Sequence, residues 1–188
     1  RHEVRAVPAW PSWKPPGTSA MTEDPTTPRL RAATPADAPR LAEIYNHYVR
    51  ETVVTFEEEP VGDAEMARRV EEIGARWMWR VAERAGTVVG YAYASPWKAR
   101  SAYRYTAECT VYLAPDAIGR GTGRLLYDRV LDELRALGMH VAIGTIALPN
   151  AASVALHEAC GFRKIAHHSE VGRKFGRWVD IGCWEKRL

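Results

Sequence analysis

The sequence contains little cysteine, no long apolar run and no strong excess of one charge. Its three cysteines, Cys109, Cys160 and Cys183, are odd in number and stand among apolar residues. This pattern predicts reduced core residues of a cytoplasmic protein and argues against a disulfide framework or a zinc site. No apolar stretch approaches the ~18 residues of a membrane span. The formal net charge of +3 comes from dispersed lysines and arginines, and it suits a small anionic ligand as well as nucleic acid.

Two familiar nucleotide-binding motifs are also missing. The glycine-rich segment 119–123 lacks the Lys and Ser/Thr pair of a P-loop, and its spacing is GxGxG rather than GxGxxG. What is present is a predicted strand that leads through these glycines into an amphipathic helix ending at Gly138. Such glycines let the backbone approach a ligand, and the first N–H groups of the helix point outward. The segment suits a phosphate or pyrophosphate, with a purely structural turn as the equal alternative.

The length of 188 residues fits one domain, and 46% of the residues are hydrophobic, which suffices for a core. Residues 1–28 are rich in proline and show neither a helical nor a strand period, so we expect a disordered leader there. Met21 is a possible natural start within this leader. Residues 29–188 are therefore expected to form a single domain.

Hydrophobic periodicity predicts alternating helices and strands in this domain. In order, we expect a strand over 29–33, helices from Thr34 and over 63–74, and strands over 77–83, 88–95 and 105–113. A helix after the glycine turn, a strand over 141–148, a helix from Asn150 to Gly161 and two strands around 172–176 follow. The last strands carry Trp178, Ile181 and Trp184, which we expect to add apolar bulk.

Several short segments, met in this order, resemble one family. They are Asn46-His47-Tyr48, residues 56–60, residues 94–100, Thr106-Ala107-Glu108 and Leu148-Pro149-Asn150. Over residues 30–188 the chain is similar to the phosphinothricin acetyltransferases of herbicide resistance, a branch of the GCN5-related N-acetyltransferases (GNAT). The resemblance implies the α/β (α+β) acyl-CoA N-acyltransferase fold, with a central mixed, mostly antiparallel sheet of about six to seven strands flanked by about four helices.

The resemblance implies a function as well. The expected reaction moves acetyl from acetyl-CoA to the α-amino group of phosphinothricin or a similar amino acid, by direct transfer in a ternary complex and without a metal. The nearest alternative is the branch that acetylates methionine sulfoximine and methionine sulfone, whose members tend to carry Asp-Trp-Arg in place of Pro96-Trp97-Lys98. An acyl-CoA sensor without catalysis is an alternative of another class. A homodimer is implied, with no nucleic-acid or membrane partner.

Two titratable groups are candidate catalytic residues, because the acceptor ammonium must lose a proton before it attacks a thioester. Glu108 lies on the polar face of its predicted strand and could take that proton directly or through a water, although pairing with an arginine is equally common. His157 shares a helix face with Ser153, and it could share the base role, relay the proton or protonate the leaving thiolate. Such a histidine is more often structural, but the resemblance favours catalysis.

The resemblance also implies the binding residues. The cosubstrate site would comprise Val111, Tyr112, Leu113, Gly119, Arg120, Gly121, Thr122, Gly123, Arg124, Asn150 and Ser153. The acceptor site would comprise Phe56, Lys98, Arg100, Tyr103 and Tyr112. Lys98 and Arg100 could clamp two anionic groups of a glutamate analogue, although solvated loop charges are nearly as common.

One position of the turn departs from the family. Ile118 stands where the family usually has Gln or Arg, so weaker cosubstrate binding is expected. His140, His167 and His168 lack ligand-like spacing, and we expect them at the surface.

Overall fold

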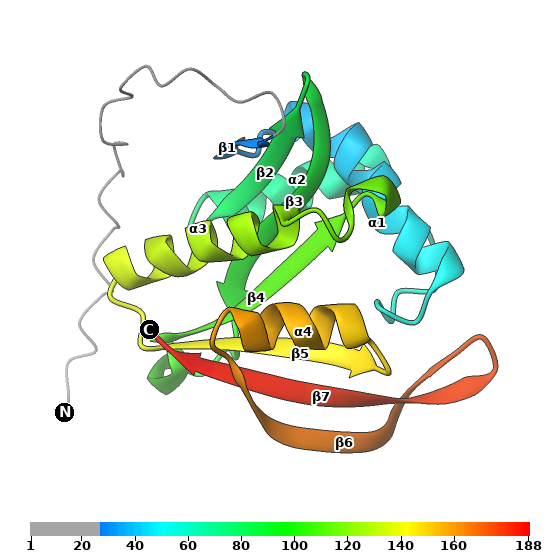
Figure 1. Cartoon of the computed structure of the whole chain (residues 1–188), viewed down its shortest axis with the longest axis vertical. Helices are drawn as coiled ribbons and strands as arrows, with labels where there is room; N and C mark the ends of the chain where they lie inside the picture. Colours follow the sequence, from blue (N-terminus) through cyan, green and yellow to red (C-terminus); the bar gives the residue numbers. More distant parts are fainter. Residues whose placement is uncertain (1–26) are drawn as a thin grey trace.

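The computed structural model describes residues 27–188, so the predicted leader falls almost wholly outside the described range. The described residues form a seven-stranded sheet in the order β1-β2-β3-β4-β5-β7-β6 (Figure 1). The strands are β1 (Arg29–Ala32), β2 (Trp79–Arg84), β3 (Thr87–Pro96), β4 (Thr106–Leu113), β5 (Val141–Leu148), β6 (Arg163–Lys174) and β7 (Arg177–Arg187). Neighbouring strands are antiparallel except β4 and β5. The predicted mixed, mostly antiparallel sheet is confirmed.

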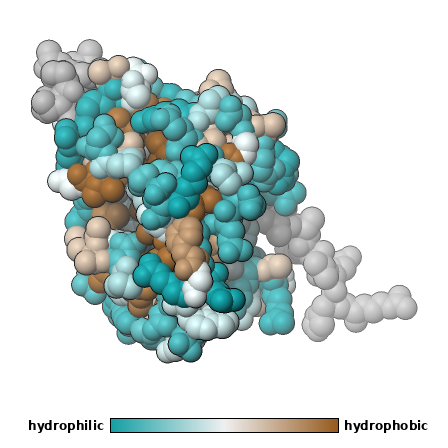
Figure 2. All heavy atoms as spheres, turned by 90° about the vertical axis from the view of Figure 1, so that its right-hand side faces the viewer, coloured by the Kyte–Doolittle hydropathy of each residue, from teal (hydrophilic) through white to brown (hydrophobic). Residues whose placement is uncertain are grey.

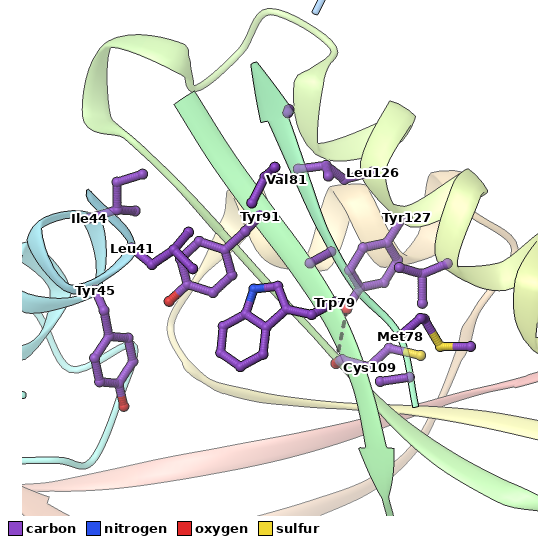
Figure 3. Close-up of a cluster of buried hydrophobic side chains, with 14 of the residues drawn as sticks. Leu41, Ile44, Tyr45, Met78, Trp79, Val81, Tyr91, Cys109, Leu126 and Tyr127 are labelled. Atoms are coloured by element: carbon purple, nitrogen blue, oxygen red, sulfur yellow. Dashed lines mark hydrogen bonds between the residues drawn. The ribbon is translucent and has the colours of Figure 1, made fainter. Parts of the chain in front are cut away.

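Helices cover this sheet on both sides. They are α1 (Ala38–Glu51), α2 (Asp63–Gly74), α3 (Thr122–Ala136) and α4 (Ala151–Ala159). Helix α3 packs on β2, β3 and β4, whereas α4 lies beside β5 (Figure 1). In the core, Leu41 and Ile44 of α1 lie beside Tyr91 on one side of the strands. Leu126 and Tyr127 of α3 lie on the other side of the strands (Figure 3). Burial of these apolar faces is what holds the layers together.

The first helix begins later than its capping signal predicts. Residues Pro35–Asp37 form a short 3₁₀ turn before α1. The Asp37 carboxylate accepts the Thr34 N–H at 2.8 Å and pairs with Arg31 at 2.7 Å. These bonds fix a tight turn at the helix start. The predicted bounds of α2 and β5 agree with the structure.

The bulky residues expected on the last strands are not equally buried. Trp184 is 2% exposed, and its indole N–H faces Glu158 of α4, but Trp178 is 60% exposed. Both residues lie on β7, and the β6–β7 hairpin projects past α4 at the end that carries Trp178 (Figure 1). A strand pattern predicts which residues share a face, but it does not predict how far a neighbouring helix extends along that face.

Candidate active site

The sheet opens between its two parallel strands. Strand β4 pairs with β5 only from Thr106 to Glu108, opposite Val141 to Ile143, although β4 continues to Leu113 and β5 to Leu148. Figure 1 shows the two strands diverging beyond this point. A cavity lies in the opening, lined by Val54, Cys109, Thr110, Val111, Tyr112, Tyr127, Thr145, Ile146, Ala147, Asn150, Ser153 and His157. Five residues that the sequence predicts for the site are therefore brought together here.

Strand β4 exposes part of its backbone to the cavity. Hydrogen bonds at both ends of the β3–β4 ladder fix which residues of β4 bond to β3. Because antiparallel pairs alternate between bonded and non-bonded, the peptide groups of Cys109, Val111 and Leu113 point away from β3, toward the diverging β5. The Cys109 and Leu113 carbonyls face the hydroxyls of Tyr127 and Tyr48 at 3.1 and 2.6 Å. Val111 therefore offers both its N–H and its C=O to a ligand in the cavity.

Glu108 stands where the two strands part. Its Oε1 accepts a hydrogen bond from the Thr145 hydroxyl of β5 at 2.7 Å, and the side chain is half-buried. Within residues 27–188 the Glu108 carboxylate forms no ion pair, so the alternative of a carboxylate paired with an arginine does not apply to the described chain. Thr145 holds one carboxylate oxygen and leaves Oε2 available. Thr145 itself was not predicted, because only the fold brings it to Glu108.

His157 is buried, at 3% exposed, and both of its ring nitrogens have partners. Nδ1 lies 2.7 Å from the Ser153 carbonyl oxygen, which only accepts, so Nδ1 carries a proton. Burial lowers the pKa of His157, which favours the neutral ring and leaves Nε2 as an acceptor 2.8 Å from the Tyr127 hydroxyl. Gly144 of β5 makes room for the ring, because a Cβ there would lie 2.3 Å from Nε2.

Tyr127 links His157 to strand β4. Its hydroxyl has one proton and two acceptors, His157 Nε2 at 2.8 Å and the Cys109 carbonyl at 3.1 Å. Figure 3 shows the second of these contacts. Burial raises the pKa of Tyr127 well above its usual range, so the hydroxyl keeps its proton. The sequence pattern identifies Tyr127 only as a residue of the amphipathic helix. Its polar role depends on contacts across the sheet opening.

The glycine turn has the geometry expected of an anion-binding segment. Gly119 and Gly121 have φ of +76° and +79°, and a Cβ at either would meet open space. The first α3 bond runs from Leu125 N to Gly121 O at 3.0 Å, so the N–H groups before Leu125 have no partner within the helix. Gly123 serves packing, since a Cβ there would lie 3.2 Å from Leu156. The glycines therefore have two different roles.

The arginines around the turn are used differently from one another. The Arg124 guanidinium pairs with Asp128 at 2.7 Å and donates to the Ala159 carbonyl at 2.8 Å, so its side chain joins α3 to α4. Arg120 is exposed and lines a hollow with Thr122 and Arg84 at the start of α3. The Arg84 Nε is buried without a hydrogen bond. No local pattern indicated a role for Arg84, because it ends a strand that is far from the turn in the chain.

The predicted acceptor residues fall into two groups. Lys98, Arg100 and Tyr103 lie on the loop between β3 and β4, which leaves the sheet at the Glu108 end because Ser95 pairs with Glu108. Neither cationic side chain has an ion-pair partner among the described residues. These three side chains do not line the cavity itself.

The second group, Phe56 and Tyr112, lies nearer to α1. Tyr112 lines the cavity, and its ring is 5.0 Å from that of Tyr45 and 5.2 Å from that of Tyr48. Phe56 is 40% exposed and lies against Gly172 of β6. The structure therefore brings the wall residues of the expected acceptor site to one end of the sheet opening.

The remaining histidines lie at the surface, as expected. His140, His167 and His168 are exposed, and His167 pairs with Asp180 at 2.7 Å. Ile118 is 48% exposed. Across residues 27–188, no three His, Cys, Asp or Glu side chains gather as metal ligands would. No helix in that range is long and apolar enough to cross a membrane.

The fold and the site define an acyl-CoA-dependent acetyltransferase, and the comparisons with known proteins give the family. Residues 30–182 match the acetyltransferase (GNAT) domain, and the chain belongs to this family. It is 40% identical to a phosphinothricin N-acetyltransferase of Streptomyces viridochromogenes, over 84% of this chain and 86% of that protein. It is 38% identical to an L-methionine sulfoximine/L-methionine sulfone acetyltransferase of Salmonella typhimurium, over 85% and 94%.

A solved structure gives the same result for the fold. The GNAT superfamily phosphinothricin acetyltransferase of Sinorhizobium meliloti, in complex with AcCoA, is 39% identical and superposes with a TM-score of 0.83, over 86% of this chain and 89% of that one. The family and the fold predicted from the sequence are confirmed.

Proposed function

We propose that this protein transfers the acetyl group of acetyl-CoA to the α-amino group of a small amino acid of the phosphinothricin type. The observation that carries the proposal is the placement of Glu108, an unpaired carboxylate at the point where β4 and β5 separate. The relatives support the proposal, since phosphinothricin N-acetyltransferases are among the proteins to which the chain is similar. A cavity, an exposed strand backbone and an anion-binding turn lie beside it.

The residues of the opening fit acetyl-CoA. The outward peptide groups of β4, chiefly Val111, would hold the amides of its pantetheine arm. The turn at Gly119 and Gly121, together with the first N–H groups of α3, would hold its pyrophosphate, and Arg84 and Arg120 add positive charge beside the turn. When bound, acetyl-CoA supplies a thioester carbonyl that an amine can attack.

Glu108 would act as the general base. With Oε1 held by Thr145, Oε2 is free to accept the proton of the acceptor ammonium, directly or through a water. The deprotonated amine then has the lone pair that the reaction requires. In the proposed reaction the amine attacks the thioester directly in a ternary complex, with no acetylated side chain between the two substrates.

His157 would act with Tyr127 rather than alone. Since Nε2 accepts from the Tyr127 hydroxyl and Nδ1 donates to Ser153, the ring orients that hydroxyl toward the cavity. Because the hydroxyl has one proton, which Nε2 accepts, a hydrogen bond to the departing thiolate would require this proton to turn from Nε2 toward the sulfur. Replacing His157 would therefore affect the reaction through Tyr127.

The acceptor would lie between the β3–β4 loop and the wall formed by Phe56 and Tyr112. Lys98 and Arg100 would bind its carboxylate and its second anionic group. The sequence Pro96-Trp97-Lys98 favours phosphinothricin over the sulfoximine and sulfone acceptors.

An enzyme with this activity would confer resistance by masking the free amine of the inhibitor. With its three cysteines free, it would work in the cytoplasm.

Thiol release from acetyl-CoA tests the proposed reaction. The acceptor panel holds phosphinothricin, methionine sulfoximine, methionine sulfone, ordinary amino acids and a peptide amine. We expect the highest kcat/KM with phosphinothricin. Turnover confined to the peptide amine would contradict a small acceptor, and stoichiometric acetyl-CoA binding without any thiol release would favour the sensor.

We also propose that the protein is a homodimer that uses the projecting end of the β6–β7 hairpin. Val171, Phe175 and Trp178 are each more than half exposed there. Figure 2, which views the molecule from the side of the hairpin end, shows apolar side chains at the surface among polar ones. Exposed apolar groups that gather in this way mark association surfaces. Light scattering is expected to give twice the 21.1 kDa chain mass, and Trp178→Ser is expected to lower it.

A further inference from the structure

A buried lysine stands outside the reaction proposed above. Lys174, the last residue of β6, is 2% exposed, and its ammonium donates to the Thr55 carbonyl at 2.8 Å. Burial lowers the pKa of Lys174, which means that the fold penalises its charge. Lysine is almost never fully buried without a reason in structure or function. The reason is expected to lie in the segment that its ammonium holds.

That segment is the loop between α1 and α2, and it borders the cavity. Val54, directly before Thr55, lines the cavity wall, and Phe56 directly follows. The Phe56 ring rests on Gly172 of β6, where a Cβ would lie 2.3 Å from the ring. Gly172 and Lys174 are two apart on one strand and so lie on the same face. Strand β6 therefore holds two consecutive loop residues, one by a hydrogen bond and one by close packing.

The opposite side of the loop is held by α1. The Tyr45 hydroxyl lies 2.7 Å from the Thr55 hydroxyl, and Asn46 exchanges two hydrogen bonds with Val61 at 2.7 and 2.8 Å. On the side of β5 and β7, the small apolar cluster of Val53 with Ala147 and Val179 is the other anchor. The loop thus spans from α1, which packs on β3 and β4, to strands on the far side of the sheet opening.

We propose that Lys174 is a positioning residue for the acceptor: its ammonium fixes the loop so that Val54 and Phe56 form one wall of the pocket. This inference rests on the proposed function, since Phe56 is taken as an acceptor contact. A charged donor makes a stronger hydrogen bond to a carbonyl than a neutral one does. The position of the pocket wall therefore depends on the Lys174 ammonium, although burial of this charge is unfavourable in the folded protein.

The melting temperature of a variant without this charge distinguishes a positioning role of Lys174 from a purely structural one. In Lys174→Met the side chain keeps a similar length but loses its charge and its donor. Since the pKa of Lys174 is lowered, the charged form is disfavoured in the folded chain relative to the unfolded one. The variant escapes that penalty, which offsets the cost of leaving the Thr55 carbonyl without its donor. We expect the melting temperature of Lys174→Met to stay equal to, or above, that of the unaltered protein. A structural lysine would instead lower it.

Steady-state kinetics of the full chain test the proposal. We expect Lys174→Met to raise the KM for phosphinothricin about ten-fold, while the KM for acetyl-CoA stays within about two-fold, because one charge-assisted hydrogen bond to the acceptor wall is lost. Lys174→Arg, which keeps a donor, is expected to recover most of the loss. Arg173→Met removes a neighbouring exposed charge on β6 and serves as the matched control, with both KM values unchanged.

A second variant covers the case in which Lys174→Met does not fold. Gly172→Ala displaces the Phe56 ring without touching any charge, and it is expected to raise the KM for phosphinothricin in the same selective way. An unchanged acceptor KM in folded Lys174→Met, or equal rises in both KM values, would overturn the proposal.

Hydrogen exchange separates this inference from the proposed function. Amide exchange over residues 52–60 is expected to speed up in Lys174→Met and to stay unchanged in Arg173→Met. If the unaltered protein acetylates no amino acid, the proposed function fails, and exchange still decides whether Lys174 fixes the loop. Unchanged exchange over residues 52–60 would overturn the positioning role on its own.

Discussion

The two sides of the sheet opening are built differently. On one side, β1 to β4 with α1, α2 and α3 supply most of the buried apolar residues of the main core. On the other, β6 is exposed along most of its length, and the separate cluster of Val53, Ala147 and Val179 is small. The first side is densely packed, whereas the second adds fewer apolar residues to the same core, among them Ile146 and Trp184, and also meets the first through several polar contacts. The residues proposed to act in the reaction are found at those contacts.

Three of these contacts cross the opening, two between side chains and one from a side chain to a backbone carbonyl. Glu108 of β4 bonds to Thr145 of β5, and Tyr127 of α3 bonds to His157 of α4. Lys174 of β6 bonds to the loop that leaves α1. Each contact joins a group on the densely packed side to a group on the side with fewer buried apolar residues. The geometry of the site therefore depends on how the two sides meet.

The largest effect is expected from removing the Glu108 carboxylate, which lies on the densely packed side. Glu108→Gln keeps the shape and the Thr145 contact but cannot accept the acceptor proton, so kcat for thiol release is expected to fall roughly 10²- to 10⁴-fold. Thr145→Val removes only the orienting hydrogen bond, and about a ten-fold loss is expected from it. Equal losses in the two variants would show that orientation, and not proton removal, dominates.

The next effect concerns the fit of His157 against β5. In Gly144→Ala the new Cβ would lie 2.3 Å from Nε2, so the ring must move away from Tyr127. We expect kcat to fall roughly ten- to hundred-fold and the unfolding free energy to drop by about 1–3 kcal/mol, as overpacking does. Gly74→Ala on α2, where a Cβ meets open space, is the matched control for both measurements.

A smaller effect is expected at the glycine turn. Gly121 has a φ of +79°, and alanine in that region costs about 1–2 kcal/mol, so Gly121→Ala is expected to raise the KM for acetyl-CoA about ten-fold by distorting the start of α3. The acceptor KM is expected to stay unchanged. Gly62 precedes α2 with a φ of −76°, and Gly62→Ala is expected to change neither constant. A rise in the acceptor KM would mean that the turn also shapes the acceptor pocket.

The smallest effect is a pH dependence of stability that arises from His157. Its folded-state pKa lies below 6.5, so as the pH falls below 6.5 the unfolded chain takes up a proton that the folded chain does not. The unfolding free energy is expected to fall in that window, by at most about 1.4 kcal/mol per pH unit, until the folded-state pKa is passed. Denaturant titrations of the unaltered protein and His157→Asn are the test, and parallel pH curves would contradict it.

Local patterns predicted much of the fold and only part of the site. The bounds of α2 and β5, and the polar face that carries Glu108, follow from periodicity within one element. Gly123 shows the limit, since its spacing suggested a phosphate contact and gave no indication that its missing side chain also makes room for Leu156. Spacing does not distinguish a glycine that faces a ligand from one that faces a helix.

The residues that the sequence did not predict share one property. Thr145, Tyr127 and Lys174 each act on a partner more than 25 positions away in the chain, across the opening of the sheet. Each looks like an ordinary strand or helix residue in its own segment. Without the pairing of β4 with β5 and of β5 with β7, no local rule brings these side chains together.

The central claim is that Glu108 takes the proton of the acceptor amine, and acceptors of graded basicity test it most directly. The loss of kcat/KM in Glu108→Gln is measured with phosphinothricin and with analogues whose amine pKa is lowered by fluorine next to the amino carbon. An amine that is already unprotonated needs no base, so the loss is expected to shrink to within about ten-fold for the least basic analogue. A loss of the same size for every acceptor would contradict the claim.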